Sequence, residues 1–191
     1  MKGAGKRLLR AGFFKLDLLK RWRDDERGLS AIEFAMLLPL LLVLFLGSVD
    51  LSQGISADRK LTYTTKTVAD LVSRTTSLTA SEMNDVLAAA TAVMAPFPAG
   101  NLRLIVSSVE IDKDGNATID WSTTLNGTAH NKGDPVTLPD ALLANKSSSL
   151  IWSEAQYLYQ PVVGYVIVGQ LTLSDQICMS PRKSIDVKYT P

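Results

Sequence analysis

The 191-residue chain has a single cysteine, Cys178, and a single histidine, His130. One cysteine excludes an intrachain disulfide framework and a cysteine-cluster zinc site, and one histidine excludes a multi-histidine metal centre. Twenty basic residues nearly balance nineteen acidic residues, which leaves a net charge of +1. This balance argues against a dedicated nucleic-acid-binding protein.

Recognisable catalytic motifs are also absent from the sequence. There is no phosphate-binding loop, no GxSxG, no HExxH and no cysteine–histidine pairing. His130 lies in the polar segment 126–132, where a solvated loop histidine is the simplest interpretation. Glu110, Asp120 and Glu154 could meet in space, but their spacing does not require it. We therefore expect a structural or assembly protein, not an enzyme, with no cofactor and no bound metal.

Apolar residues are concentrated in one run, Phe34–Val49, in which 13 of the 16 residues are apolar and none is charged. A helix over residues 29–51 would rise about 34 Å, enough to cross a hydrocarbon layer of roughly 30 Å. Glu33 and Asp50 bracket the run and would then lie near the two membrane interfaces. The run is slightly long for the core of a cleaved signal peptide, and no clear small-x-small site follows it at once. The sequence predicts a transmembrane helix over residues 29–51.

The charges on the two sides of this helix differ. Residues 1–28 contain nine Lys/Arg and four acidic residues, whereas residues 51–191 contain 11 basic and 13 acidic residues. By the positive-inside rule, the N-terminus is cytoplasmic and the C-terminal part is outside. The basic leader itself could lie on an anionic membrane face or form a disordered tail.

The junction between leader and helix reads Arg27-Gly-Leu-Ser-Ala-Ile-Glu33-Phe34. A carboxylate at mid-bilayer costs ~2.5–3.5 kcal/mol, and less near the interface. Glu33 could simply snorkel to the interface. Alternatively, cleavage after Gly28 would give Leu29 a free α-amino group four residues before Glu33. That amine, from the same chain or from a neighbour, could neutralise the carboxylate.

This arrangement resembles a type IV prepilin signal, in which a basic leader and a glycine precede a glutamate and a hydrophobic helix. The stretch from Gly28 through Glu33-Phe34 and Pro39 to the leucine run resembles the TadE/TadG-like proteins of the tight-adherence (Flp) pilus system. The short chain favours the TadE-like side of that family. The strand–acidic turn–strand pattern that ends at Trp121-Ser122 also resembles the part of these proteins that lies outside the membrane.

The resemblance implies a TadE-like pseudopilin of the bacterial inner membrane that assists assembly of adhesive pili. Its partners would be membrane lipid, a prepilin peptidase, other pilins or pseudopilins and the assembly machinery. The implied processing site is Gly28–Leu29, Glu33 and Phe34 serve assembly, and Pro39 kinks the helix. A plain single-pass anchor for a periplasmic binding or sensing domain remains the alternative, and an exported enzyme released by signal peptidase is a third possibility.

Beyond the apolar run, the pattern predicts that the helix continues through Ser77, with a partial apolar stripe at 3.6-residue spacing. The members of this stripe are Leu61, Val68, Leu71, Val72 and Leu78. Thr79 and Glu82 then form a capping box that opens a second helix, Ala80–Met94, which Pro96 and Pro98 end.

From Asn101 onward the pattern is typical of strands. We expect strands at Leu102–Ile111, Ala117–Ser122 and Leu150–Tyr159, with Leu171–Met179 as the last strand. The acidic turn Asp112–Asn116 between the first two lacks EF-hand spacing, which favours a plain turn over a calcium loop. Loops are expected at 126–132 and 147–149, and a short helix at Asp140–Asn145. The apolar residues 162–168 are too few to span a bilayer and could be membrane-proximal, a core strand or a loop under the head.

The expected fold class is therefore α+β and pilin-like, with a long N-terminal helix and a small antiparallel β-sheet head. Its regions are a basic cytoplasmic leader (1–28), the transmembrane helix (29–51), a helical stalk with a second helix (52–100) and the β-rich extracytoplasmic head (101–191). Cys178 is expected to be a buried small hydrophobe. The aromatic residues of the head are expected to be core and cross-strand residues; they are Trp121, Trp152, Tyr157, Tyr159 and Tyr165.

Overall fold

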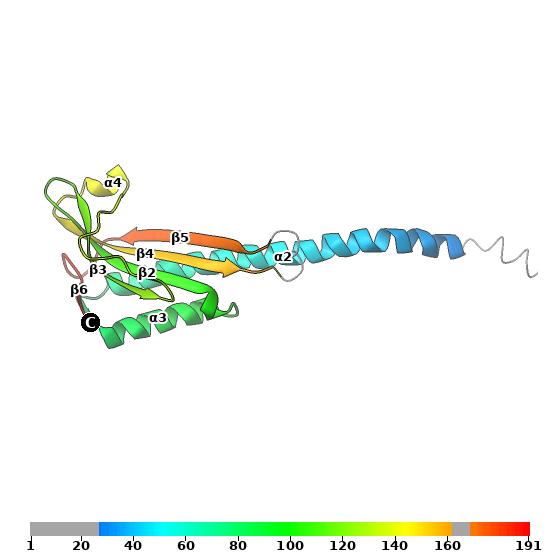
Figure 1. Ribbon diagram of the computed structural model, residues 1–191, viewed down its shortest axis with the longest axis horizontal. Coiled ribbons are helices and arrows are strands. Elements are labelled where there is room, and N and C mark those ends of the chain that lie inside the picture. Colours follow the sequence, from blue (N-terminus) through cyan, green and yellow to red (C-terminus); the bar gives the residue numbers. More distant parts are fainter. Residues whose placement is uncertain (1–26, 162–168) are drawn as a thin grey trace, which may run out of the picture. The chain divides into compact units, whose positions relative to one another are not determined.

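The computed structural model describes residues 27–161 and 169–191 and has the expected α+β fold (Figure 1). The predicted leader, apart from its last two residues, and the apolar segment 162–168 lie outside the described residues. The elements in chain order are α2 (Arg27–Ser73), β1 (Ser77–Thr79), α3 (Ala80–Met94), the 3₁₀ turn η1 (Ala99–Asn101), β2 (Leu102–Ile111), β3 (Ala117–Leu125), α4 (Asp140–Leu143), β4 (Ser148–Tyr159), β5 (Leu171–Met179) and β6 (Lys188–Thr190). The chain divides into two compact units, Met1–Ser48 and Val49–Pro191. From here on, the second unit is called the head; it includes the predicted stalk and second helix as well as the β-rich region.

Four strands of the head form an antiparallel sheet in the order β3-β2-β4-β5. The alternation of apolar and polar residues along β2 explains its central place, because Leu102, Leu104 and Val106 all point to one buried face. The pairing of β2 with β3 shifts between Ser108 and Val109, which marks a β-bulge.

The turn between β2 and β3 is held by the Asp112 carboxylate. Its Oδ1 accepts hydrogen bonds from the backbone N–H groups of Asp114 and Asn116, both at 2.8 Å, and its Oδ2 accepts one from the Asn116 side chain. The bonds from Asn116 hold the pKa of Asp112 below its usual range. The predicted plain turn is confirmed, and this carboxylate is engaged within it.

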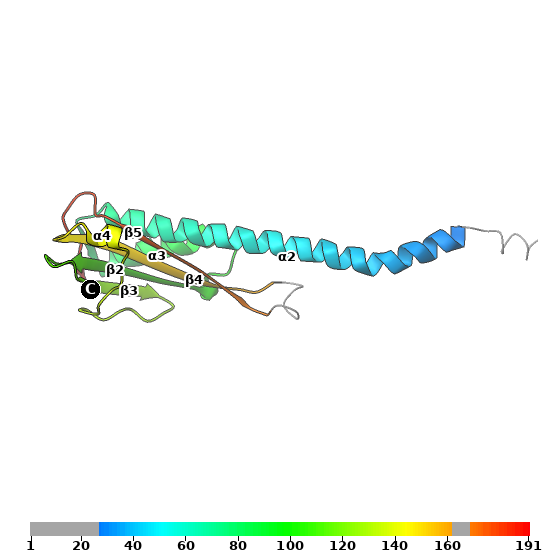
Figure 2. The same ribbon diagram turned by 90° about the horizontal axis from the view of Figure 1, so that it is seen from above.

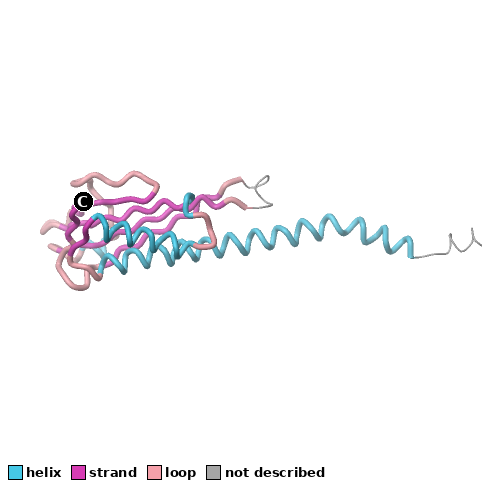
Figure 3. The backbone as a smooth tube through the Cα atoms, turned by 90° about the horizontal axis from the view of Figure 1, so that it is seen from below, coloured by secondary structure: helices cyan, strands magenta, loops and turns pink. Residues whose placement is uncertain are grey.

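One face of the sheet packs against α3 and the part of α2 that follows Ser48 (Figures 2 and 3). From α2, Ala57, Leu61, Val68 and Val72 are fully buried against the sheet at helical spacing. Three of the five residues in the predicted stripe thus lie in the core as helical residues. Leu71 does not, because it points outward and stays exposed.

The opposite face of the sheet is covered at one end by the loop after β3 and by α4. A second apolar cluster there joins Val109, Ile111 and Ile119 to Leu138 and Leu150. The loop is tied to the sheet edge by an isolated bridge between Thr118 and Pro135.

The second helix is confirmed with the predicted bounds and the predicted cap. The Glu82 backbone N–H donates to Thr79 Oγ1 at 3.3 Å, and the Thr79 backbone N–H donates to Glu82 Oε2 at 2.8 Å. These reciprocal bonds satisfy two backbone donors at the helix start. The Thr79 backbone N–H and the Thr79 hydroxyl, which both donate to the Glu82 carboxylate, hold the pKa of Glu82 below its usual value.

Helix α2 ends at Ser73, four residues earlier than predicted, and Leu78 lies in strand β1 instead. Near the helix end, the side chains of Ser73 and Thr75 bond to the carbonyls of Asp70 and Val72. The backbone N–H of Arg182 donates to the Ser73 carbonyl at 2.8 Å. The helix thus ends where side-chain hydroxyls and the backbone N–H of Arg182 bond to the carbonyls of its last turn.

The strand pattern differs from the expectation in three places. β1 pairs in parallel with β6, so Leu171–Met179 is not the last strand. β3 extends three residues beyond Ser122. β4 begins at Ser148, inside the segment expected to be a loop, and α4 ends at Leu143, before the predicted Asn145. The parallel pair was missed because its two short strands lie far apart in the sequence and have little pattern of their own.

Candidate functional site

The predicted membrane segment is the first part of α2, whose apolar side chains are almost all exposed. An 18-residue window of this helix has a mean hydropathy of 2.5 and is not buried within the structure. Leucines, valines and phenylalanines from Leu29 through Leu51 present their side chains outward on every side of the helix. A helix that is apolar all round and not covered by any described residue of its own chain suits a lipid environment.

The predicted processing residues lie at the very start of this helix. Because α2 begins at Arg27, both Gly28 and Leu29 belong to its first turn, not to the segment that precedes it. Leu29 is exposed, and a Cβ added at Gly28 would meet nothing within 4 Å. The bond between these residues is thus unobstructed by the described part of the chain.

Glu33 and Phe34 follow one turn later, and both are exposed. Glu33 is the only charged residue between Gly28 and Val49. Leu29 and Glu33 are four residues apart, so they share one face of the helix. This spacing would let an amine on residue 29 approach the Glu33 carboxylate.

Pro39 lies inside α2, which continues on both sides of it. Proline has no backbone N–H, so the Ala35 carbonyl loses its usual helical donor. The kink expected there remains a prediction.

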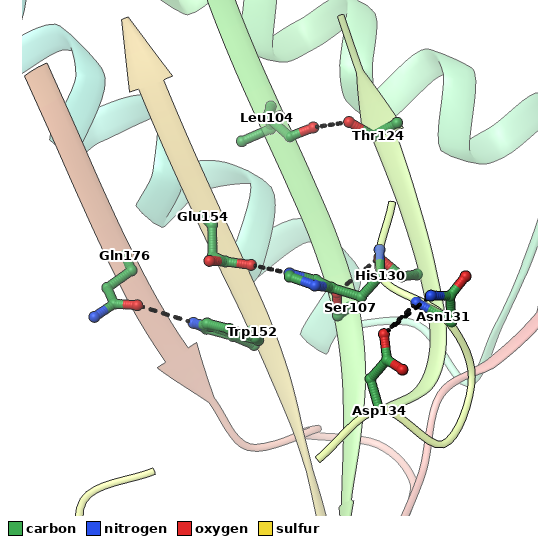
Figure 4. A network of polar contacts seen from close by, with 10 residues as sticks. Leu104, Ser107, Thr124, His130, Asn131, Asp134, Trp152, Glu154 and Gln176 are labelled. Carbon is green, nitrogen blue, oxygen red and sulfur yellow. Dashed lines mark hydrogen bonds and ion pairs between the residues drawn. The ribbon is translucent and has the colours of Figure 1, made fainter. Parts of the chain in front are cut away.

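The head contains a cluster that the sequence did not reveal, built around His130 (Figure 4). Its imidazole stacks on the indole of Trp152, with ring centroids 5.3 Å apart and an angle of 10° between the planes. Its Nε2 lies 2.6 Å from Oε2 of Glu154. His130 lies in a loop, as expected, and its side chain is 32% exposed, but it has partners that the sequence did not indicate, because the loop after β3 folds back across the sheet.

Hydrogen bonds from neighbouring groups hold this loop in place. The His130 backbone N–H donates to Ser122 Oγ, and Ser107 Oγ lies 2.9 Å from the same oxygen. Trp152 Nε1 donates to the Gln176 side chain at 3.3 Å. The histidine ring faces a carboxylate and an indole, so the two serines have no imidazole base beside them. The cluster attaches the loop to the sheet.

At the end of the sheet that holds the β2–β3 turn, a cleft of about 830 Å³ is lined by acidic residues and serines. Glu110 and Asp120 both line it, whereas Glu154 lies with His130, so the three carboxylates do not meet. Lys132 pairs with Asp120 at 2.7 Å, which raises the pKa of the lysine. Among residues 27–161 and 169–191, no group of three or more His, Cys, Asp or Glu side chains is arranged to hold a metal ion.

Cys178 is half-buried on β5, beside Trp152 at a small pocket under α4. Burial raises the pKa of its thiol, and the nearby Glu154 acts in the same direction. A raised pKa disfavours the reactive thiolate. The side chain is less buried than expected but is an apolar packing residue.

The fold defines the class of protein: an α+β protein with a helix, α2, that is long and apolar enough to cross a membrane. Within that class, the family model for the TadE-like protein matches residues 28–70, which make up most of α2. The resemblance that the junction and the leucine run suggested is thereby confirmed for this segment. No curated protein and no solved structure matches the chain significantly. The match and the apolar helix together fit a membrane protein associated with Tad pili.

Proposed function

We propose that the protein is a pseudopilin-like component that assists assembly or secretion of tight-adherence (Flp-type) pili, and that a prepilin peptidase cleaves it between Gly28 and Leu29. One observation carries the proposal: the TadE-like match begins at Gly28, in the first turn of a helix whose apolar part, up to Val49, has Glu33 as its only charged residue and is not covered by the described part of the chain. A peptidase that works at a membrane surface needs an accessible bond beside the span, and the first turn of α2 offers one.

The same proposal fixes an orientation. The net charge of +5 on residues 1–28 keeps the leader in the cytoplasm, and the head then lies in the periplasm. The protein is a single-pass protein of the bacterial inner membrane. Its partners are membrane lipid, the prepilin peptidase, other pilins or pseudopilins and the assembly machinery.

In this proposal, the carboxylate of Glu33 forms an ion pair that favours assembly. An uncompensated carboxylate in or near hydrocarbon costs free energy, and a free amine on Leu29 of the same or a neighbouring chain offsets that cost. Phe34 adds apolar surface next to this charge pair. Processing would thus convert a poorly tolerated carboxylate into half of an ion pair between helices. No enzymatic role is proposed for the head.

N-terminal sequencing of the protein recovered from cell envelopes tests this function. In cells with an active prepilin peptidase, we expect the sequence to begin at Leu29, and a Gly28→Val variant to retain the leader. Gly47→Val is the matched control, since a Cβ at Gly47 also meets nothing within 4 Å. This control is expected to be processed normally.

Other N-termini support the competing functions. A wild-type chain that begins at Met1 or Lys2 would be an ordinary anchored protein and would contradict the processing step. A start after the span, near Asp50 or Ala57, would indicate an exported enzyme released by signal peptidase. The acidic cleft is the feature that favours the anchored alternative, in which the head binds or senses a ligand.

A further inference from the structure

The last residues of β4 lie against the first residues of α2 that belong to the head. The hydroxyl of Tyr159 donates to the backbone carbonyl of Asp50 at 3.1 Å, and Tyr159 is buried. Gly54 makes room for the aromatic ring, because a Cβ at that position would lie 3.4 Å from Tyr159 Cε1. In the register of β4 and β5, Tyr159 pairs with Leu171. The start of β5 is thus held at the same level of the helix.

That level is where the helix leaves the predicted membrane span. Asp50 directly follows the uncharged apolar run. Residues 50–54 cover about 6 Å of helix, which is comparable to the headgroup layer on one side of a bilayer. A β-strand whose end is bonded to residue 50 therefore reaches the headgroup region on the side of the head.

The surface at this end of the head has the chemistry expected of a membrane contact. Leu51 is 66% exposed, Ile55 48% and Leu171 41%. The sequence between Glu154 and Asp175 contains no charged residue over 20 positions. By contrast, the opposite end of the sheet holds the acidic cleft. Exposed apolar side chains suit an interface with lipid, and the first exposed charges beyond them on α2 are the adjacent pair Asp58 and Arg59.

We propose that this end of the head, where Leu51, Ile55 and Leu171 are exposed, rests in the headgroup layer of the leaflet on the side of the head. The occupant is lipid because the surface continues directly from the apolar span along the same helix. The inference rests on α2 spanning the membrane, as in the proposed function. It adds a second membrane contact, which restrains the head at the bilayer surface.

Nitroxide accessibility in the full-length chain tests this contact. In a Cys178→Ser background, single spin labels are placed by Leu41→Cys, Leu171→Cys and Ile185→Cys. Ile185 is the matched control, because it is 80% exposed and lines the acidic cleft. The protein is reconstituted at one copy per nanodisc, in phosphatidylethanolamine and phosphatidylglycerol. Collisions with molecular oxygen, which partitions into lipid, are compared with collisions with a water-soluble nickel chelate.

We expect the label at position 171 to collide several-fold less with the nickel chelate than the label at position 185, and more with oxygen. Equal nickel accessibility at these two positions, with position 41 in lipid, would overturn this inference and leave the membrane span intact. A water-exposed label at position 41 would instead overturn the span itself. Protection of position 171 that requires several copies per disc would identify a second copy as the occupant and would also overturn the proposal.

Discussion

At the scale of single residues, Gly54 connects the helix to the sheet. It lies in the interior of α2, where glycine costs about 1 kcal/mol relative to alanine. The contact with Tyr159 explains its presence, since the ring occupies the space beside the missing side chain. Burial and the neighbouring Asp50 raise the pKa of Tyr159, so its hydroxyl stays protonated as a donor at neutral pH.

Replacing Gly54 by leucine should therefore destabilise the head. The larger side chain must displace the Tyr159 ring and break its bond to the Asp50 carbonyl, which we expect to cost about 1–3 kcal/mol. Urea unfolding of the full chain in detergent, followed by tryptophan fluorescence, measures the loss. Ser52→Leu is the control, because Ser52 is exposed on the same helix. A Gly54→Leu variant as stable as this control would mean that the Tyr159 contact contributes nothing.

His130 illustrates what single positions in the sequence cannot reveal. Its neighbours in the chain are polar loop residues, and its partners Trp152 and Glu154 lie on a strand more than 20 residues away. No pattern in the sequence near His130 indicates a contact with these two residues. The only available signal was the alternation of Trp152 and Glu154 along one face of β4.

At the scale of elements, local signals predicted the bounds of α3, β2 and β5. A capping box, an alternating strand and a turn aspartate each involve only a few neighbouring residues, so they can be recognised in the sequence. The early end of α2 and the β1–β6 pair depend on contacts between segments about 110 residues apart, such as Arg182 on Ser73. Contacts between such distant segments leave no periodic pattern in the sequence from which they could be predicted. For the candidate site, the sequence predicted the apolar helix, which the structure contains, whereas the roles of Gly28 and Glu33 stay predictions. The cluster around His130 was not predicted.

The capping box gives a direct test at this scale. Thr79→Ala removes the acceptor for the Glu82 backbone N–H, and we expect the free energy of unfolding to fall by about 1 kcal/mol. Thr62→Ala is the matched control, since Thr62 is exposed within α2. Equilibrium unfolding of both variants in the same detergent provides the comparison. Equal stability of the two would show that α3 is held by packing alone.

The β2–β3 turn should depend on pH through Asp112. Hydrogen bonds from Asn116 lower the pKa of Asp112 in the folded state, so its contribution to stability is complete above the ordinary aspartate value of about 3.9. It is lost as the pH falls through the lower folded value. We therefore expect wild type to be more stable than Asp112→Asn near neutral pH, and the difference to shrink in acid below that ordinary value.

Chemical unfolding at a series of pH values measures this difference. Asp114→Asn removes a neighbouring exposed carboxylate of the same turn and serves as the control. A stability difference for Asp112→Asn that persists unchanged in acid would contradict the role of the charge in the turn.

At the scale of the whole molecule, the two units carry different chemistry. The first unit has a leader rich in positive charge and an apolar helix with exposed side chains, whereas the second has its own core and a slight excess of acidic residues. Exposing the apolar side chains of this helix to water would be unfavourable, whereas the head buries its own core without a membrane. A single chain thus combines a segment suited to lipid with a domain suited to an aqueous compartment.

This asymmetry predicts how the chain inserts. Changing Lys20, Arg21, Arg23 and Arg27 to glutamine lowers the net charge of the leader from +5 to +1. Basic residues next to a span dominate its orientation, so we expect a several-fold decrease in the activity of alkaline phosphatase fused after Pro191, because that enzyme is active only outside the cytoplasm.

The control removes the same number of charges from the head, at Lys113, Lys146, Lys183 and Lys188. These positions are far from the span in the sequence, and residues in a translocated domain have little influence on orientation. Phosphatase activity should therefore stay high in the control, and immunoblots normalise both values to the amount of fusion protein. If the leader variant and the control were equally active, leader charge would not set the topology, and the orientation would have to come from the apolar run and the head.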